Sequence, residues 1–62
     1  MEEAVPIGEQ IKACREAAGL TQTELARKAG LTQSAISEIE SGKRRRPSWE
    51  TIHKIQTALA SA

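Results

Sequence analysis

The sequence of 62 residues has no phenylalanine and no tyrosine, and Trp49 is its only tryptophan. Its hydrophobic core must therefore consist of isoleucine, leucine and alanine, which pack well between helices, and no segment has the pattern of a strand. A chain this short forms one small domain and leaves little room for a substrate cleft. We therefore expect an all-α protein that is not an enzyme.

Cysteine and histidine are almost as scarce. Cys14 is the only cysteine, which excludes an intramolecular disulfide, and its place in an apolar stripe predicts a small core residue. His53 has no cysteine or histidine at ligand spacing and no phosphate-binding loop is present, so we expect neither a metal nor a cofactor. No apolar run has membrane-spanning length, and the first residues, Met-Glu-Glu, do not resemble a signal peptide. We expect a cytoplasmic protein.

The net charge of +1 is also small, but its distribution is uneven. Residues 1–24 carry a net charge of −3, and residues 25–46 carry a net charge of +4. A domain with one basic side can bind phosphates as well as a uniformly basic domain does. The small total therefore does not exclude a nucleic-acid partner.

Glycine and proline divide the chain into four segments, and the first two have clear helical patterns. Residues 7–18 place apolar side chains at spacings of four, three and four, which predicts an amphipathic helix that ends at Gly19. The members of this stripe are Ile7, Ile11, Cys14 and Ala18. The next residues, Thr21-Gln22-Thr23-Glu24, form a capping box that begins a second helix, which we expect to run to about Ala29.

Two further helices follow. Thr32 is the expected N-cap of the third, which ends at Gly42, and its inner face consists of Ala35, Ile36 and Ile39. Ser48 is the expected N-cap of the fourth, whose predicted buried stripe is Trp49, Ile52, Ile55 and Leu59. We expect Trp49 to fill the core, and an intermolecular contact is the alternative.

The second and third helices are separated only by Ala29-Gly30-Leu31. A turn this short forces two short helices to cross steeply, as in a helix-turn-helix. Ala26 supplies a small side chain at the crossing, and Gly30 tolerates the positive φ that the turn needs. The polar side chains of the third helix then lie on its opposite side; they are Gln33, Ser34, Ser37, Glu38 and Ser41.

The stretch from Gly19 to Pro47 contains the pattern LTQxELAxxxGLTQxxISxIExG, which resembles the lambda-repressor-like, or Cro/repressor (xenobiotic-response-element), family. The resemblance extends over about residues 7–60. It implies a compact four-helix DNA-binding domain over residues 7–60, with the helix-turn-helix at about residues 22–41. Residues 1–6 are then an N-terminal tail, and residues 61–62 are the C-terminal end.

The resemblance also implies a function and a set of contacts. The protein would bind double-stranded DNA in the major groove as a transcriptional regulator, a repressor that acts as a homodimer on a near-palindromic operator. The residues implied to contact base edges are Gln33, Ser34, Ser37 and Glu38. The residues implied to contact phosphates are Gln22, Ser41, Lys43, Arg44, Arg45 and Arg46. Arg15 and Glu40 match positions that form an ion pair between helices.

Plainer interpretations stay open. The polar face of the third helix can be merely solvated, and the basic run after it can be a solvated loop or a localisation signal. An antitoxin-type regulator that also binds a toxin, and a protein-interaction module that has lost DNA binding, are the alternative functions. Family domains commonly carry a fifth helix. Either this chain is a fragment, or another copy or another chain completes its core.

Overall fold

The computed structural model describes residues 7–44 and 46–61, and these form four helices and no strand. The helices are α1 (Ile7–Ala17), α2 (Gln22–Ala29), α3 (Gln33–Ser41) and α4 (Trp49–Ala60). The predicted all-α, four-helix class is confirmed, and the helices begin and end close to the residues expected from the sequence. Within the described ranges, no helix is long and apolar enough to cross a membrane. The predicted tail at residues 1–6 lies outside those ranges.

Side-chain caps fix where three of the helices begin. In the predicted capping box, the Glu24 amide donates to Thr21 Oγ1 at 3.1 Å, and the Thr21 amide donates to Glu24 Oε1 at 2.8 Å. The hydroxyls of Thr32 and Ser48 each accept a hydrogen bond, at 3.1 Å, from the amide three residues further on. Each cap satisfies a backbone donor that the helix leaves without an internal partner. Local sequence therefore sets the first residue of α2, α3 and α4.

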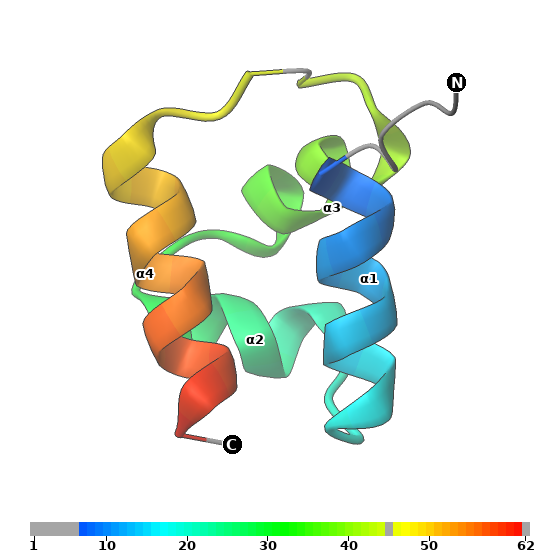
Figure 1. Cartoon of the computed structure of the whole chain (residues 1–62), viewed down its shortest axis with the longest axis vertical. Coiled ribbons are helices and arrows are strands. Elements are labelled where there is room, and N and C mark those ends of the chain that lie inside the picture. The colour runs from blue at the N-terminus through cyan, green and yellow to red at the C-terminus, as the bar shows by residue number, and fades with distance from the viewer. Residues whose placement is uncertain (1–6, 45, 62) are drawn as a thin grey trace, which may run out of the picture.

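The helices pack so that α3 is held from two sides. It packs against both α1 and α2, and α4 packs mainly against α2. In Figure 1, α1 and α4 run in the same direction down opposite sides of the molecule, α2 crosses near their lower ends, and α3 lies behind. The contact between α1 and α4 is much smaller than the other three.

The core is aliphatic, as the absence of phenylalanine and tyrosine requires. Its fully buried large side chains come from three helices and are Leu25, Ile36, Ile39 and Ile55. Burial of one such side chain stabilises the fold by about 1.5–3 kcal/mol. Ala26 and Ala29 are also buried, and their small side chains let α2 approach its neighbours closely.

Gly8 marks the closest approach of α1 to α3. A Cβ atom at this position would overlap the carbonyl oxygen of Ile39 and would lie 3.1 Å from the Cα atom of Glu40. Any larger residue must therefore push the start of α1 away from α3. Gly8 is required for space, a constraint that the sequence analysis did not predict.

The predicted inner face of α1 is partly wrong. Ile11 is buried and Ile7 is half-buried, but Cys14 and Ala18 are exposed. The buried face consists instead of Gly8, Ile11 and Arg15. The reason is that α1 packs mainly on α3 and much less on α4, so the face that contains Arg15, one residue beyond Cys14, turns inward.

The predicted burial of Trp49 is also wrong, because its exposed fraction is 77%. The buried residues of α4 are Ile55 and Ala58, and Ile52 and Leu59 are half-buried. Figure 1 shows why: the first turn of α4 lies at the end of the helix that is far from α2. Trp49 instead lies beside His53 on the same helix, with their ring centroids 6.3 Å apart.

Candidate nucleic-acid interface

The turn between α2 and α3 has the geometry that the sequence predicts. Gly30 has a φ of 72°, and the Leu31 amide donates to the carbonyl of Ala26 at 2.8 Å. This bond closes the end of α2 and turns the chain directly into the cap of α3. Buried Ile36 and Ile39 then anchor α3 against the core.

The side of α3 that faces away from the core is polar and is not covered by another helix. Gln33, Ser34 and Ser41 are exposed, while Ser37 and Glu38 are half-buried. All five residues that were predicted to contact DNA from this helix therefore lie on one accessible surface. We call these five residues, Gln33, Ser34, Ser37, Glu38 and Ser41, the α3 face.

A chain of hydrogen bonds connects the α3 face to the interior. Gln33 Nε2 donates to Gln22 Oε1 at 2.7 Å, and Gln22 Nε2 donates to Glu40 Oε1 at 3.0 Å. Gln22 stands at the start of α2, so its side chain bridges the two helices of the motif. The sequence predicts only a phosphate contact for Gln22 and gives no sign of this bridge.

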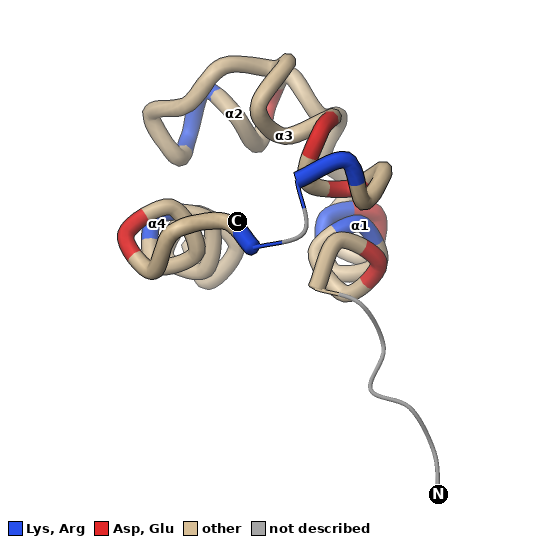
Figure 2. Tube along the Cα trace, turned by 90° about the horizontal axis from the view of Figure 1, so that it is seen from above, with Lys and Arg blue, Asp and Glu red and all other residues tan. Residues whose placement is uncertain are grey.

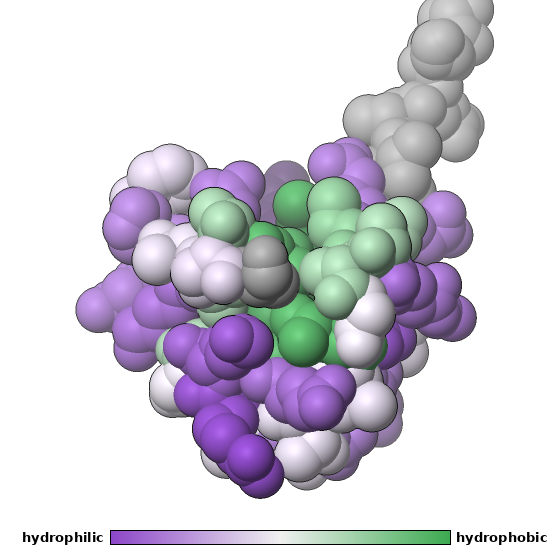
Figure 3. Space-filling model, turned by 90° about the horizontal axis from the view of Figure 1, so that it is seen from below, coloured by the Kyte–Doolittle hydropathy of each residue, from purple (hydrophilic) through white to green (hydrophobic). Residues whose placement is uncertain are grey.

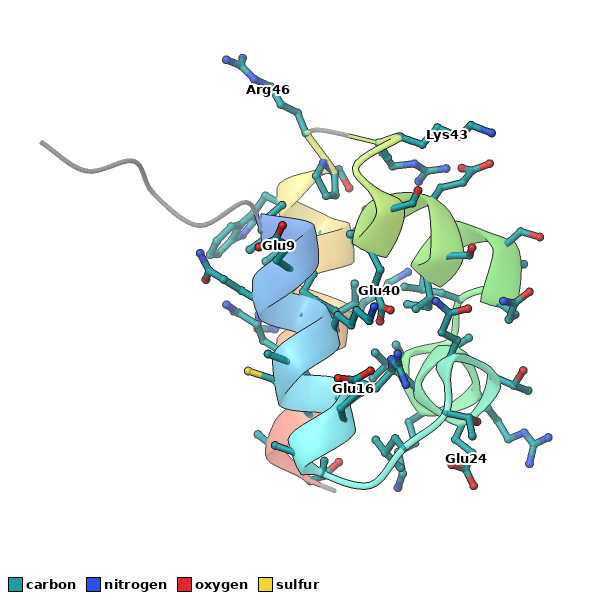
Figure 4. The ribbon with its side chains drawn as sticks, turned by 90° about the vertical axis from the view of Figure 1, so that its right-hand side faces the viewer. Glu9, Glu16, Glu24, Glu40, Lys43 and Arg46 are labelled. Carbon is teal, nitrogen blue, oxygen red and sulfur yellow. The ribbon has the colours of Figure 1, made fainter. Side chains whose placement is uncertain are left out.

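Glu40 is held in turn by Arg15 on α1. Arg15 Nε donates to Glu40 Oε2 at 2.7 Å, and the Nη2 atom donates to Glu40 Oε1 at 3.1 Å. The exposed fractions of the two side chains are only 10% and 3%. The hydrogen bond to Glu40 raises the pKa of Arg15 above its usual value, although desolvation acts in the opposite direction. Figure 4 shows Glu40 directed inward, between the helices.

Arg15 also ties this pair to the loop before α2. Its Nη1 atom donates to the carbonyl of Leu20 at 2.7 Å. One guanidinium therefore joins α1, which carries it, to α3 and to the loop between α1 and α2. No described buried side-chain nitrogen or oxygen lacks a partner. A buried ion pair of this kind is tolerated because its remaining donors and acceptors are satisfied.

The residues after α3 form a second polar cluster. Arg44 Nη2 lies 3.1 Å from Glu38 Oε1, and the Arg44 amide donates to the Glu38 carbonyl at 3.0 Å. Ser41 Oγ donates to the same carbonyl at 3.2 Å and accepts from the Lys43 amide at 3.4 Å. The only hydroxyl proton of Ser41 is therefore used within α3.

The predicted basic run does not form a single patch. Lys43 and Arg46 are both exposed, but in Figure 4 their side chains extend to opposite sides, with Lys43 on the side of α3. Figure 2 shows basic positions along the segment that follows α3, with acidic positions of α3 beside them. Arg45, which was also predicted to contact a phosphate, lies outside the described residues.

Lys12 is a candidate contact that the sequence pattern does not predict. It lines an open polar cavity of about 160 Å³ together with Gln22, Ser37, Glu40 and Ser41. Lys12 is exposed on α1, one turn before Arg15, and it brings a positive charge next to three predicted DNA contacts. Its position next to these contacts follows only from the packing of α1, because in the sequence Lys12 lies in the acidic half and far from the helix-turn-helix.

Away from this surface, the gap between α1 and α4 is apolar. A groove there is lined by Ile7, Gln10, Ile11, Cys14, Ile52, Ile55, Gln56 and Leu59. Figure 3, seen from below, shows apolar surface gathered in the middle of the molecule and surrounded by polar side chains. Among the described residues, no group of three histidine, cysteine or acidic side chains is placed to hold a metal ion.

Comparison with known proteins gives a family and named relatives. Residues 6–61 match the family model of a helix-turn-helix domain. Over 52 residues the chain is 46% identical to the HTH-type transcriptional repressor RghR of Bacillus subtilis. The matched region is 84% of this chain and 38% of that protein. Over 53 residues it is 38% identical to the HTH-type transcriptional regulator SinR of Bacillus subtilis, and the matched region is 86% of this chain and 48% of that protein. The chain thus spans less than half the length of these relatives.

Proposed function

Because the chain belongs to the helix-turn-helix family of the Cro/repressor (xenobiotic-response-element) type, we propose that it binds double-stranded DNA with sequence specificity and represses transcription. The observation that carries this proposal is the uncovered α3 face, which continues directly into Lys43 and Arg44. A polar helix side beside cationic groups suits the major groove, where base edges lie between two rows of phosphates.

In this proposal, α3 enters the major groove and its side chains contact base edges. Gln33 can bond to adenine through its amide, and Ser34 and Ser37 can bond to several bases. Glu38 would accept from the amino group of cytosine. In the free protein this carboxylate is paired with Arg44, which would leave it for a phosphate.

The proposed phosphate contacts flank this helix. Lys43 and Arg44 would bind the backbone beside the end of α3, and Arg45 and Arg46 would bind it further along the same loop. The first turn of α2, which begins at Gln22, would bind the backbone at the other end of the motif. Lys12 adds a charge at the cavity between these two regions. Ser41 would have to exchange its hydrogen bond to the Glu38 carbonyl for one to a phosphate.

We propose that the protein acts in the cytoplasm as a homodimer on a near-palindromic operator and is not a catalyst. Two copies of α3 would then enter successive major grooves about 34 Å apart. The apolar groove between α1 and α4 and the exposed Trp49 support a contact with another protein surface, because exposed apolar surface is costly unless it is covered. The same surface would suit a toxin or a further domain, which keeps an antitoxin-type regulator as the second candidate.

The test is an anisotropy titration of a labelled random-sequence duplex across a salt series. Affinity that falls linearly with salt on logarithmic axes is expected, because bound cations displace counterions from the phosphates. Lys43→Ala should weaken binding to all sequences alike and lower the salt slope by about one. Gln33→Ala should cost about 1–3 kcal/mol, mainly on the preferred sequence.

Two outcomes would contradict the proposal. Absence of binding at low salt would favour a protein-interaction module that keeps the fold without binding DNA. Equal losses for Gln33→Ala on preferred and random duplexes would remove its assignment to a base contact.

A further inference from the structure

We propose that buried Glu40 determines which way round Gln33 presents its amide to a base, and that it does so through Gln22. The four side chains Arg15, Glu40, Gln22 and Gln33 form one continuous series of hydrogen bonds, which we call the amide relay. This inference rests on the proposed function, since it concerns how the α3 face discriminates between bases.

The relay has a direction because its inner end can only accept. Glu40 faces a guanidinium that does not lose its proton, so the carboxylate has no hydrogen to donate. Gln22 must therefore turn its NH₂ group towards Glu40, at 3.0 Å. Its carbonyl oxygen then points the other way, towards α3.

The same logic fixes the next amide. The carbonyl oxygen of Gln22 can only accept, so Gln33 must turn its NH₂ group towards it, at 2.7 Å. In the described part of the chain, this is the one hydrogen bond that the Gln33 side chain makes. One N–H and the carbonyl oxygen of Gln33 therefore stay available to a ligand, with the nitrogen on the α2 side.

The order of donor and acceptor matters to the base that is bound. Adenine offers N7 as an acceptor and N6 as a donor, side by side in the major groove, and a correctly oriented glutamine satisfies both. An inverted amide would exchange donor and acceptor, so the pair would no longer match the same base from the same position. Glu40 is thus a positioning residue that makes no contact with DNA.

Arg15 makes this arrangement rigid. Its two hydrogen bonds hold both carboxylate oxygens, and its third, to the Leu20 carbonyl, holds the guanidinium against the loop that leads into α2. The Glu40 acceptor and the loop that leads to Gln22 are therefore both held in place. The relay orients Gln33 before DNA arrives, which reduces the entropy lost on binding.

The test measures base preference with the full chain and a pool of duplexes that carry a randomised central segment. Bound duplexes are sequenced to give the preference at each position, and Gln33→Ala identifies the position that Gln33 contacts. At that position the wild-type protein should prefer adenine about 5- to 150-fold, the discrimination given by one bidentate contact. Circular dichroism checks that each variant is folded.

Two variants break the relay at different points. Glu40→Gln replaces the obligate acceptor with an amide that can also donate, so both orientations of Gln22 become accessible. Gln22→Met removes the bridge and leaves the buried pair of Arg15 and Glu40 intact. We expect each to lower the adenine preference at the Gln33 position by at least about fivefold, without changing preferences elsewhere. Glu50→Gln is the control, since it makes the same change of charge at an exposed site on α4.

Each outcome has a distinct meaning. If the wild-type chain enriches no sequence, the proposed function fails, whatever the variants do. If the wild type prefers adenine and both variants keep that preference, the relay is overturned while the function stands. A Gln22→Met variant that binds all sequences more weakly but keeps its preference also overturns it, because Gln22 is then only a phosphate ligand. A loss spread over all positions in Glu40→Gln indicates a purely structural role. If Glu40→Gln does not fold, Gln22→Met decides.

Discussion

Replacement of Arg15 by methionine tests the energetics of the buried pair. The variant keeps an unbranched side chain of similar length but removes three hydrogen bonds, two to Glu40 and one to the Leu20 carbonyl. The Glu40 side chain, of which 3% is exposed, would keep only the hydrogen bond from Gln22. An almost fully buried charge would then lack its counter-charge.

The expected loss is large in relation to the stability of the domain. Removal of one partner from a buried ion pair costs about 3–5 kcal/mol, because the other charge stays desolvated. A chain of this length has a total free energy of unfolding of about 3–9 kcal/mol. Arg15→Met should therefore leave a substantial fraction of the molecules unfolded, whereas Arg15→Met with Glu40→Leu should recover much of the loss.

Urea denaturation followed by circular dichroism measures these differences in the free energy of unfolding. Glu16→Gln is the control, because Glu16 lies 3.9 Å from Arg15 but is 59% exposed, and it should change stability little. The reasoning is refuted if Arg15→Met costs less than about 1 kcal/mol, or if the double variant is less stable than the single one.

Three further predictions concern stability and use the same denaturation assay. Gly8→Ala should destabilise the fold by about 1–3 kcal/mol, although alanine favours helices, because its Cβ overlaps the Ile39 carbonyl; a gain in stability would contradict this close approach. Thr21→Ala should cost about 1 kcal/mol by removing a cap, and an equal effect of Thr23→Ala at a neighbouring exposed site would argue against the capping box. Trp49→Ala should change stability by no more than about 0.5 kcal/mol, since the side chain is 77% exposed. A larger loss would mean that Trp49 is buried.

The sequence predicted the helices well because the determinants of their ends are local. A capping box, two single caps and the glycine at a helix end each involve residues no more than a few positions apart. The turn at Gly30 has the same character. These interactions stabilise one backbone path regardless of the rest of the fold, so the order and length of the helices follow from pattern alone.

The sequence predicted the helix faces less well because burial depends on neighbours. The spacing of Cys14 and Ala18 fits an apolar stripe, but the partner of that side of α1 is the distant α4, which leaves both residues exposed. Buried Arg15 gains its place from Glu40, a residue 25 positions away. Periodicity identifies an apolar side of a helix but not the element that covers it.

In the candidate site, too, some features follow from local sequence and others depend on packing. The α3 face follows from helical periodicity, since residues 33, 34, 37, 38 and 41 share one side of a helix. The relay through Gln22, the proximity of Lys12 and the separation of Lys43 from Arg46 depend on how helices and loop lie in space. No spacing rule in the sequence connects residues 12, 22 and 40.

The pair formed by Glu38 and Arg44 links the two halves of the proposed interface. Both side chains are close to half exposed, at 44% and 46%, so their ion pair contributes no more than about 1 kcal/mol and exchanges readily. If Arg44 moves to a phosphate, the Glu38 carboxylate is left facing the major groove and repels DNA unless a cytosine amino group meets it. A phosphate contact by Arg44 therefore makes Glu38 selective, because the repulsion is relieved only on the right base pair. The Lys43 side chain has no ion pair among the described residues, so its contact with a phosphate does not depend on the base that meets Glu38. Lys43 should therefore strengthen binding to every sequence alike.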